Sequence, residues 1–217
     1  MKIAVLGTGE VGRRIAGRLA GLGHEVTLGS RTADNADAAK WAEESGGAHG
    51  TFADAAASAE LVVNATGGLV SLAALEAAGA ENLRGKVLVD VSNPLDFSQG
   101  FPPNVVTFDG LSLAEHLQKA FPEARVVKTL NTMSNTVMVE PGLVPGDHNV
   151  FVSGDDEDAK AVVTGLLGSF GWPADRVLDL GDLSSARATE QVLPIWLRLY
   201  GVLGTGDFNF AVSVAKG

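Results

Sequence analysis

The chain has no cysteine among its 217 residues and few basic side chains, with Lys and Arg totalling 16 against 26 Asp and Glu. The missing cysteine excludes disulfide bonds, thiolate nucleophiles and cysteine metal sites. The net charge of −10 argues against nonspecific binding to nucleic acid or to anionic membranes. A basic residue near a candidate site is therefore stronger evidence for anion binding there.

The sequence also lacks a long apolar run and a secretion signal. No stretch approaches an uninterrupted membrane span, and a strand pattern occupies the N-terminus. We therefore expect a soluble cytoplasmic protein that binds neither membranes nor nucleic acid. At this length the chain can bury a full hydrophobic core, as one domain or as a domain with a smaller cap.

The sequence pattern is organised around residues 2–32. An apolar run breaks into Gly7-Thr8-Gly9-Glu10-Val11-Gly12, and apolar residues recur at helical spacing directly afterwards. In a dinucleotide-binding turn the first glycine allows the bend, the second lets the pyrophosphate approach and the third lets the helix pack closely. The free N–H groups of the helix N-terminus then bind phosphate. The alternative is a glycine-rich βαβ unit without a nucleotide.

The end of the second predicted strand, 24–28, indicates which dinucleotide binds. An NAD site usually places Asp or Glu there, whereas an NADP site omits the acid and supplies a cation or hydroxyls for the 2′-phosphate. Here Ser30, Arg31 and Thr32 follow the strand. Arg31 is suited to charge-assisted hydrogen bonds with a phosphate. We predict NADP over the alternative in which Arg31 is a solvated loop cation and Thr32 caps a helix.

Strands alternate with helices along the rest of the chain, which is typical of a Rossmann-like α/β fold with a doubly wound, mainly parallel sheet. The later strands are predicted at 49–52, 60–66, 86–91, 125–130, 149–153 and 176–180, and the helices at 34–44, 69–78, 112–121, 156–170 and 184–203. Residues 53–59 and 96–103 are predicted connections. We expect a dinucleotide-binding core at 1–130 and a small C-terminal α/β extension at 131–217 packed on it.

Polar residues and glycines at the ends of the buried strands are further candidates for the site. The carboxyl ends of parallel strands meet at one edge of the sheet, where the nicotinamide and a second substrate would lie. The candidates are Ala65, Thr66, Gly67, Asn93, Pro94, Asn131 and Thr132. For the polar stretch 131–135 the alternative is a turn in which Asn and Ser bond to the local backbone.

No nucleophile elbow, Walker loop or metal-ligand pair occurs, and the four histidines have no partner at motif spacing. The acidic run 155–158 is expected to cap a helix rather than to bind metal. We therefore predict no catalytic side chain, and the chemistry must come largely from the cofactor, by direct hydride transfer.

The terminal helix, 184–203, is apolar nearly all round, which predicts that it is buried and that Pro194 kinks it. It either covers the sheet or forms a homodimer interface.

Several motifs together resemble the NADPH-dependent coenzyme F-420 reductase family, which is related to the N-terminal part of pyrroline-5-carboxylate reductases. The resemblance covers nearly the whole chain, through the turn 7–12 and the stretches 29–31, 90–95, 128–132, 153–157 and 179–187. It implies that residues Thr8 to Val11 cradle phosphates and that Ser30 with Arg31 holds the 2′-phosphate.

The resemblance further implies an NADP(H)-dependent oxidoreductase that exchanges hydride with a small-molecule acceptor, coenzyme F-420 or a flavin. The loops 65–68 and 131–134 are more polar than the corresponding proline-containing loops of members that reduce the deazaflavin. Two alternatives are a non-enzymatic NADP(H)-binding sensor and, ranked third, an imine or small carbonyl reductase. The third requires a proton donor, for which Thr66, Asn131 and Thr132 are poor candidates.

Overall fold

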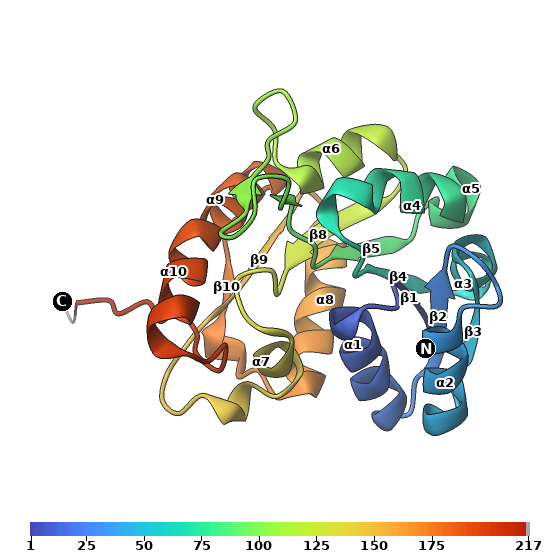
Figure 1. Cartoon of the computed structure of the whole chain (residues 1–217), viewed down its shortest axis with the longest axis horizontal. Helices are drawn as coiled ribbons and strands as arrows, with labels where there is room; N and C mark the ends of the chain where they lie inside the picture. The colour runs from blue at the N-terminus through green and yellow to red at the C-terminus, as the bar shows by residue number, and fades with distance from the viewer. Residues whose placement is uncertain (216–217) are drawn as a thin grey trace.

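The computed structural model describes residues 1–215, which form one eight-stranded sheet covered by helices on both faces (Figure 1). The strand order is β10-β9-β8-β5-β4-β1-β2-β3. All neighbours from β3 to β8 are parallel, whereas β9 is antiparallel to β8 and parallel to β10. The strands are β1 (Lys2–Leu6), β2 (Glu25–Ser30), β3 (Ala48–Thr51), β4 (Leu61–Asn64), β5 (Val87–Asp90), β8 (Arg125–Thr129), β9 (Val150–Gly154) and β10 (Val177–Asp179).

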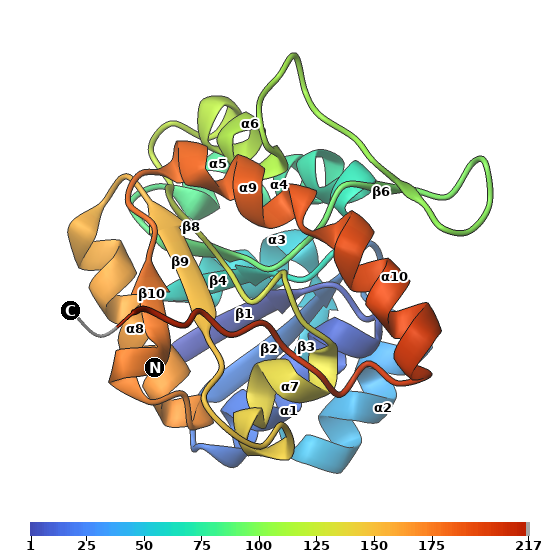
Figure 2. The same cartoon turned by 90° about the vertical axis from the view of Figure 1, so that its left-hand side faces the viewer.

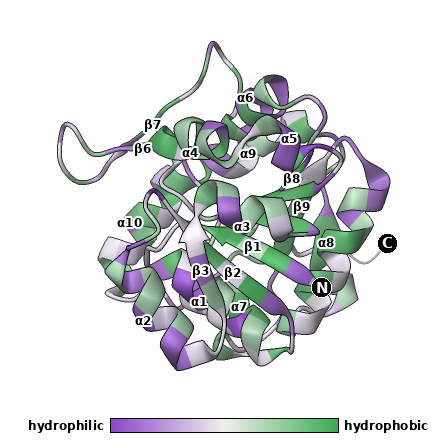
Figure 3. Ribbon diagram, turned by 90° about the vertical axis from the view of Figure 1, so that its right-hand side faces the viewer, coloured by the Kyte–Doolittle hydropathy of each residue, from purple (hydrophilic) through white to green (hydrophobic). Residues whose placement is uncertain are grey.

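The predicted fold class is confirmed, because the six strands from β3 to β8 have the order of a doubly wound dinucleotide-binding sheet. The strands β9 and β10 extend that same sheet, while the division at residue 130 and the homodimer stay predictions. Strands β4 and β5 are buried throughout, as expected for parallel strands covered on both faces. Hydrophobic residues accordingly run along the strands, and polar residues mark the outer helices (Figure 3).

Two hydrophobic cores lie on opposite faces of the sheet (Figure 2). The first packs β-strand side chains against α1 (Glu10–Gly21), α2 (Ala36–Ser45), α7 (Asn135–Val139) and α8 (Glu157–Phe170). The second packs them against α3 (Phe52–Ser58), α4 (Ser71–Ala78), α5 (Ala80–Leu83), α6 (Leu113–Ala120) and α9 (Ala186–Gln191). None of the helices within residues 1–215 is both long and apolar enough to cross a membrane.

Local capping explains where the helices begin, and it corrects one prediction and excludes one alternative. The segment 53–59 is not a bare connection but most of α3, which starts in a capping box between Thr51 and Asp54. Thr32 caps no helix, because Asn35 caps α2 by accepting the N–H of Ala38 at 2.9 Å. In the acidic run 155–158, Asp156 caps α8, as predicted.

Two short elements lie outside the prediction. The loop region 96–103 is flanked by β6 (Leu95–Asp96) and β7 (Asn104–Val105), which pair antiparallel and carry the long loop seen in Figure 2. Directly after the polar stretch 131–135, α7 forms and buries Val137, Met138 and Val139 in the first core.

The terminal helix is present, but it is interrupted at Val192, two residues before Pro194, where α9 ends and α10 (Leu193–Leu203) begins. The prediction that this helix is buried all round is wrong for α10. Of its side chains only Leu193 and Leu197 are buried, whereas Val202 is 82% exposed. The physical reason is position: α10 lies beside the sheet rather than over a face (Figures 1 and 2).

The segment after α10 turns back along the start of β9, as Figure 2 shows. The backbone N–H of Asn149 donates to the carbonyl of Phe210 at 2.9 Å, and the N–H of Val212 donates to Oδ1 of Asn149 at 2.8 Å. The amide of Asn209 donates to the carbonyl of Asn149. These bonds hold the C-terminal segment at the edge of the sheet where β9 begins and its antiparallel neighbour β8 ends.

Candidate cofactor and acceptor site

A groove crosses the carboxyl edge of the sheet and consists of two cavities that share Ala65, Thr66 and Gly67. We call the first, of about 560 Å³, the turn cavity, because it is lined by the glycine turn and the end of β2. The second, of about 510 Å³, is the aromatic cavity, walled by residues of α10. The shared residues follow β4, which is the neighbour of β1 at the point where the strand order reverses.

The glycine turn after β1 requires two of its glycines for its own folding. Gly7 has a φ of +116°, and a Cβ there would lie 2.6 Å from the carbonyl oxygen of Ala65. A Cβ on Gly12 would lie 1.9 Å from the carbonyl oxygen of Gly7, so only glycine lets α1 pack this closely. Glycine at these two positions is required by the turn itself and is therefore no evidence for a ligand.

Gly9 differs from both, because a Cβ there would meet no atom within 4 Å. Its φ of −68° and ψ of 179° are open to any residue. Gly9 is the N-cap of the 12-residue helix α1 and lines the turn cavity. The fold therefore does not require glycine at this position, whereas a phosphate bound close to the backbone at a helix N-terminus does.

Among the residues that the structure describes, Arg31 is the one charged residue that lines the turn cavity. Its side chain is exposed and, within residues 1–215, it takes part in no ion pair or side-chain hydrogen bond. Ser30 beside it is buried, and its hydroxyl donates to the carbonyl oxygens of Thr32 and Gly50. The described lining of this cavity contains no carboxylate, so its electrostatics favour an anion.

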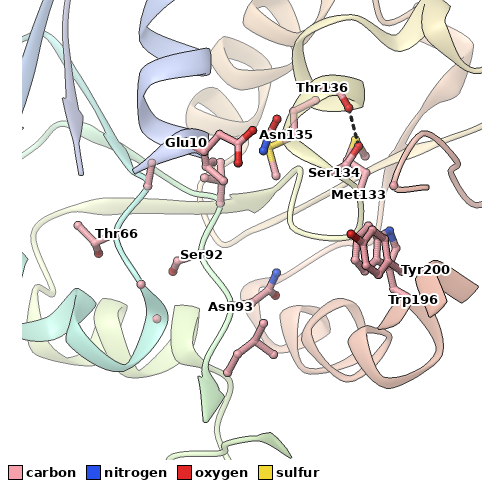
Figure 4. A pocket seen from close by; sticks show the side chains of 18 of the residues that line it. Glu10, Thr66, Ser92, Asn93, Met133, Ser134, Asn135, Thr136, Trp196 and Tyr200 are labelled. Carbon is pink, nitrogen blue, oxygen red and sulfur yellow. Dashed lines mark hydrogen bonds between the residues drawn. The ribbon is translucent and has the colours of Figure 1, made fainter. Parts of the chain in front are cut away.

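Three stacked aromatic rings stand beside the second cavity. Trp196 lies 5.7 Å from Tyr200 and 5.2 Å from Phe208 between ring centroids, with interplanar angles of 12° and 24°. Trp196 and Tyr200 face Thr66 across the cavity (Figure 4). A flat aromatic wall of this kind offers stacking surface to a planar ring.

Polar side chains lie among the apolar residues that line the rest of the aromatic cavity. The hydroxyl groups of Ser134 and Thr136 lie 2.8 Å apart, and Thr136 donates to the carboxylate of Asp207 at 2.7 Å (Figure 4). At the opposite side Asn93 donates to the carbonyl of Asn131 at 2.7 Å. The polar floor predicted from the loops after β4 and β8 is therefore present, with Thr66 and Ser134 in the lining.

A buried network supports Thr66 from below. Its hydroxyl donates to Oδ1 of Asn64 at 2.7 Å, and the amide of Asn64 donates to Asp90 at 2.9 Å. Asp90 in turn pairs with Lys128 at 2.7 Å, and Lys128 pairs with Glu190 at 2.9 Å. Burial alone would lower the pKa of Lys128, but the two carboxylates outweigh this effect and raise it. Lys128 is therefore a charged structural group beneath the groove.

The structure brings most of the predicted site residues to the groove. Those that line it are Gly7, Thr8, Gly9, Glu10, Val11, Ser30, Arg31, Ala65, Thr66, Gly67 and Asn93. Those that do not line it are Gly12, Thr32, Pro94, Asn131 and Thr132. Asn131 and Thr132 are each 2% exposed, because the turn after Leu130, whose φ is +61°, directs them into the protein.

Sequence reasoning missed the outer wall of the aromatic cavity. Its residues are Thr136, Trp196, Tyr200, Gly206 and Asp207, whereas Met133, Ser134 and Asn135 belong to the polar stretch 131–135 that the sequence places at this edge. Trp196 and Tyr200 are four residues apart and therefore share one face of α10, which is the only local signal. That signal is equally typical of a core helix.

Comparisons with known proteins identify the family of the chain. The family model of coenzyme F420-dependent NADP oxidoreductases matches residues 2–94. The F420-dependent NADP reductase of Methanothermobacter thermautotrophicus is 34% identical over 217 residues, covering 92% of this chain and 89% of that protein. A crystal structure of a candidate F420-dependent NADP-reductase from Arthrobacter sp. FB24 is 56% identical, with a TM-score of 0.93 over 99% of this chain and 100% of that chain.

A second kind of relative matches over a smaller part of its length. The metalloreductase STEAP3 of Rattus norvegicus is 32% identical over 210 residues, which is 90% of this chain but only 38% of that protein. The resemblance inferred from the motifs is thus confirmed by relatives that the chain covers almost completely. The chain belongs to the family of coenzyme F420-dependent NADP oxidoreductases.

Proposed function

We propose that the protein reduces a deazaflavin, or a flavin of similar shape, with hydride from NADPH. The observation that carries the proposal is the groove itself: a cavity with a free cation and an open helix N-terminus shares a wall with a cavity flanked by stacked aromatic rings. When bound, NADPH supplies the hydride. The chain supplies binding, orientation and the shape of the acceptor site.

The turn cavity fits NADP in three respects. The space at Gly9 and the N-terminus of α1 suit the pyrophosphate. Arg31 lies at the end of β2, where the ribose bearing the 2′-phosphate is bound in this fold. The residue after β2 is not the Asp or Glu that an NAD site would use for the 2′-OH.

The aromatic cavity suits the acceptor. Thr66 and Gly67 belong to both cavities, so a dinucleotide that follows the groove ends next to the aromatic wall. No His, Lys or Cys lines this cavity in the part of the chain that the structure describes, and its acidic groups are the carboxyls of Glu10 and Asp207 and the phenol of Tyr200. Hydride transfer between two planar rings requires orientation above all, which rigid lining residues supply.

The decisive experiment follows NADPH oxidation by the loss of nicotinamide absorbance in a stopped-flow instrument. The acceptors are coenzyme F420, riboflavin and a cyclic imine, each at several concentrations. We expect saturable oxidation with the ring acceptors and none above the buffer rate with the imine. If no acceptor oxidises NADPH while NADPH still binds, the protein is a nucleotide-binding sensor and the proposal is wrong.

A matched pair of glycine variants tests where the nucleotide binds. Gly9→Val places a branched side chain in open space, so the protein should fold and lose NADPH affinity. Gly12→Val instead forces a side chain against the carbonyl of Gly7 and should lower stability. Calorimetric titration with NADPH and thermal unfolding separate the two effects. Unchanged NADPH affinity in a folded Gly9→Val variant contradicts the assigned site.

A further inference from the structure

Thr66 lies where the two cavities of the groove meet, and it lines both of them (Figure 4). In the part of the chain that the structure describes, the two cavities share three residues, and the other two are Ala65 and Gly67. Thr66 therefore supplies the one polar side chain at the junction. A dinucleotide that passes from the turn cavity into the aromatic cavity runs past its hydroxyl group.

The amide of Asn64 has a single possible orientation in the buried network behind Thr66. Its side chain is fully buried between the carboxylate of Asp90 and the backbone N–H of Thr66. The carboxylate, which pairs with Lys128, only accepts hydrogen bonds, so the NH2 group of Asn64 must face it, at 2.9 Å. The backbone N–H only donates, so Oδ1 must face Thr66, at 3.3 Å. An acceptor is therefore fixed behind Thr66.

This orientation determines where the hydroxyl hydrogen of Thr66 points. The hydroxyl oxygen lies 2.7 Å from Oδ1 of Asn64 and 2.9 Å from the hydroxyl of Ser71, which lines neither cavity. Both bonds keep the hydrogen of Thr66 inside the network, whichever of the two hydroxyl groups donates to the other. Turning it into the groove would leave buried Asn64 with only the long bond from the backbone. The hydroxyl thus presents a lone pair to the groove.

We infer that Thr66 accepts a hydrogen bond from the carboxamide NH2 of the nicotinamide and so fixes the orientation of the ring at the junction of the two cavities. The carboxamide is the one group of this ring that carries N–H donors, and a hydroxyl that accepts without donating selects for it. Fixing the carboxamide fixes which part of the ring faces the aromatic cavity. The inference rests on the proposed function, because it places the nicotinamide at the junction.

NADP and its 3-acetylpyridine analogue are the test pair. The acetyl group of the analogue keeps the carbonyl of the carboxamide but has no N–H. Calorimetric titration gives both dissociation constants without any acceptor present. We expect the wild type to bind NADP about threefold to tenfold more tightly than the analogue, which is the effect of one neutral hydrogen bond.

Four variants locate the cause. Thr66→Val removes the hydroxyl and keeps the shape of the side chain, so the affinity for NADP should fall to that for the analogue, which should itself not change. Thr66→Ser keeps the hydroxyl and should keep most of the preference. Ser71→Ala removes a bond of the network but not the acceptor at the junction, and Thr164→Val removes a half-buried hydroxyl on α8 that lines neither cavity. Both controls should retain the preference.

The outcomes separate this inference from the proposed function. Equal dissociation constants of NADP and the analogue in the wild type overturn it, even if Thr66→Val does not fold. A preference that survives in a folded Thr66→Val variant also overturns it, and a raised acceptor KM in that variant would then assign Thr66 to the acceptor ring. Failure of every acceptor to oxidise NADPH overturns the proposed function alone, because the titrations contain no acceptor.

Discussion

Asn93 and Asn131 exchange hydrogen bonds across the carboxyl edge of the sheet: the amide of Asn93 donates to the carbonyl of Asn131 at 2.7 Å, and the amide of Asn131 donates to Oδ1 of Asn93 at 2.9 Å. The amide of Asn131 also donates to the carbonyl of Thr189 at 3.0 Å. The loops after β5 and β8 are thereby fixed to each other and to α9, and Asn93 is held in the wall of the aromatic cavity.

Replacing Asn131 tests this arrangement. Asn131→Ala leaves the buried polar partners unsatisfied and should lower the free energy of unfolding by about 1–3 kcal/mol. Asn93 keeps its bond to the backbone carbonyl of residue 131 but loses the amide that binds its Oδ1, so the KM for the acceptor should rise modestly while the affinity for NADPH stays the same. Urea unfolding and steady-state kinetics give the two readouts. A variant with wild-type stability would show that the pair does not hold the two loops.

A second prediction concerns the ion pair between Lys128 and Glu190 beneath the groove. Lys128→Met leaves the carboxylates of Asp90 and Glu190 buried without their cation, and this should cost about 3–5 kcal/mol. Lys40→Met removes an exposed lysine that pairs with Glu44 on the same helix, and it should cost under about 0.5 kcal/mol. Equal unfolding midpoints for the two variants in urea would contradict the structural role of Lys128.

The turn cavity could be predicted from the sequence because the residues that line it are close together in the chain. Gly7, Gly9 and Arg31 lie within one strand–turn–helix–strand unit, so spacing and residue type determine where they meet. The aromatic cavity could not be predicted in the same way. Its wall joins Ser134 to Trp196 and Asp207, which are far apart in the chain and meet only in the folded protein.

Two differences between the prediction and the structure have physical reasons of the same kind. An all-round apolar pattern on α10 predicts burial, but it cannot distinguish a core helix from a helix that walls a cavity beside the sheet. Asn131 and Thr132 were predicted to lie in the site because they follow a parallel strand. The positive φ of Leu130 directs both side chains inward, and nothing in a leucine signals a left-handed backbone.

The pH dependence of stability has a predictable contribution from Glu115. Partial burial would raise the pKa of this carboxyl, but hydrogen bonds from Arg187 and Ser112 outweigh it and hold the pKa below its usual value of 4.5. A depressed pKa in the folded state stabilises the protein above pH 4.5, and that stability is lost as the pH falls further.

Glu115→Gln removes this contribution. The variant should be about 1 kcal/mol less stable than wild type at neutral pH, where the carboxylate completes a capping box and pairs with Arg187. The difference should shrink as the pH falls below about 4.5, since the wild-type carboxyl is then protonated as well. Urea unfolding at a series of pH values measures it, and a difference that is constant with pH argues against the ionised form as its source.

The half-buried position of Trp196 changes the expected effect of its removal. Trp196→Ala should cost about 2 kcal/mol, less than the ~3–5 kcal/mol for a fully buried tryptophan. Because Trp196 lines the aromatic cavity, where it stacks with Tyr200 and Phe208, the loss should fall mainly on acceptor binding. The measurements are thermal unfolding, the acceptor KM and the dissociation constant of NADPH. An unchanged acceptor KM would remove the aromatic wall from the acceptor site.

The last prediction concerns the choice between NADPH and NADH. Arg31 is exposed and unpaired within residues 1–215, so it can bind a 2′-phosphate without first breaking an ion pair. A charge-assisted contact of this kind contributes roughly 1.5–3 kcal/mol. Arg31→Ala should therefore weaken NADPH binding by about 10- to 100-fold, since 1.4 kcal/mol corresponds to a factor of ten. NADH has no 2′-phosphate, and its affinity should change little.

Arg13→Ala is the matched comparison for Arg31→Ala. The guanidinium of Arg13 donates to the carbonyl of Thr8 at 2.6 Å and so supports the glycine turn that both nucleotides use. Its removal should weaken NADPH and NADH by similar factors, whereas removal of Arg31 should change their ratio. Isothermal titration with both nucleotides at two salt concentrations gives the four dissociation constants, and the Arg31 effect should diminish at the higher salt. If Arg31→Ala weakens both nucleotides equally, or if the wild type already prefers NADH, Arg31 does not bind the 2′-phosphate.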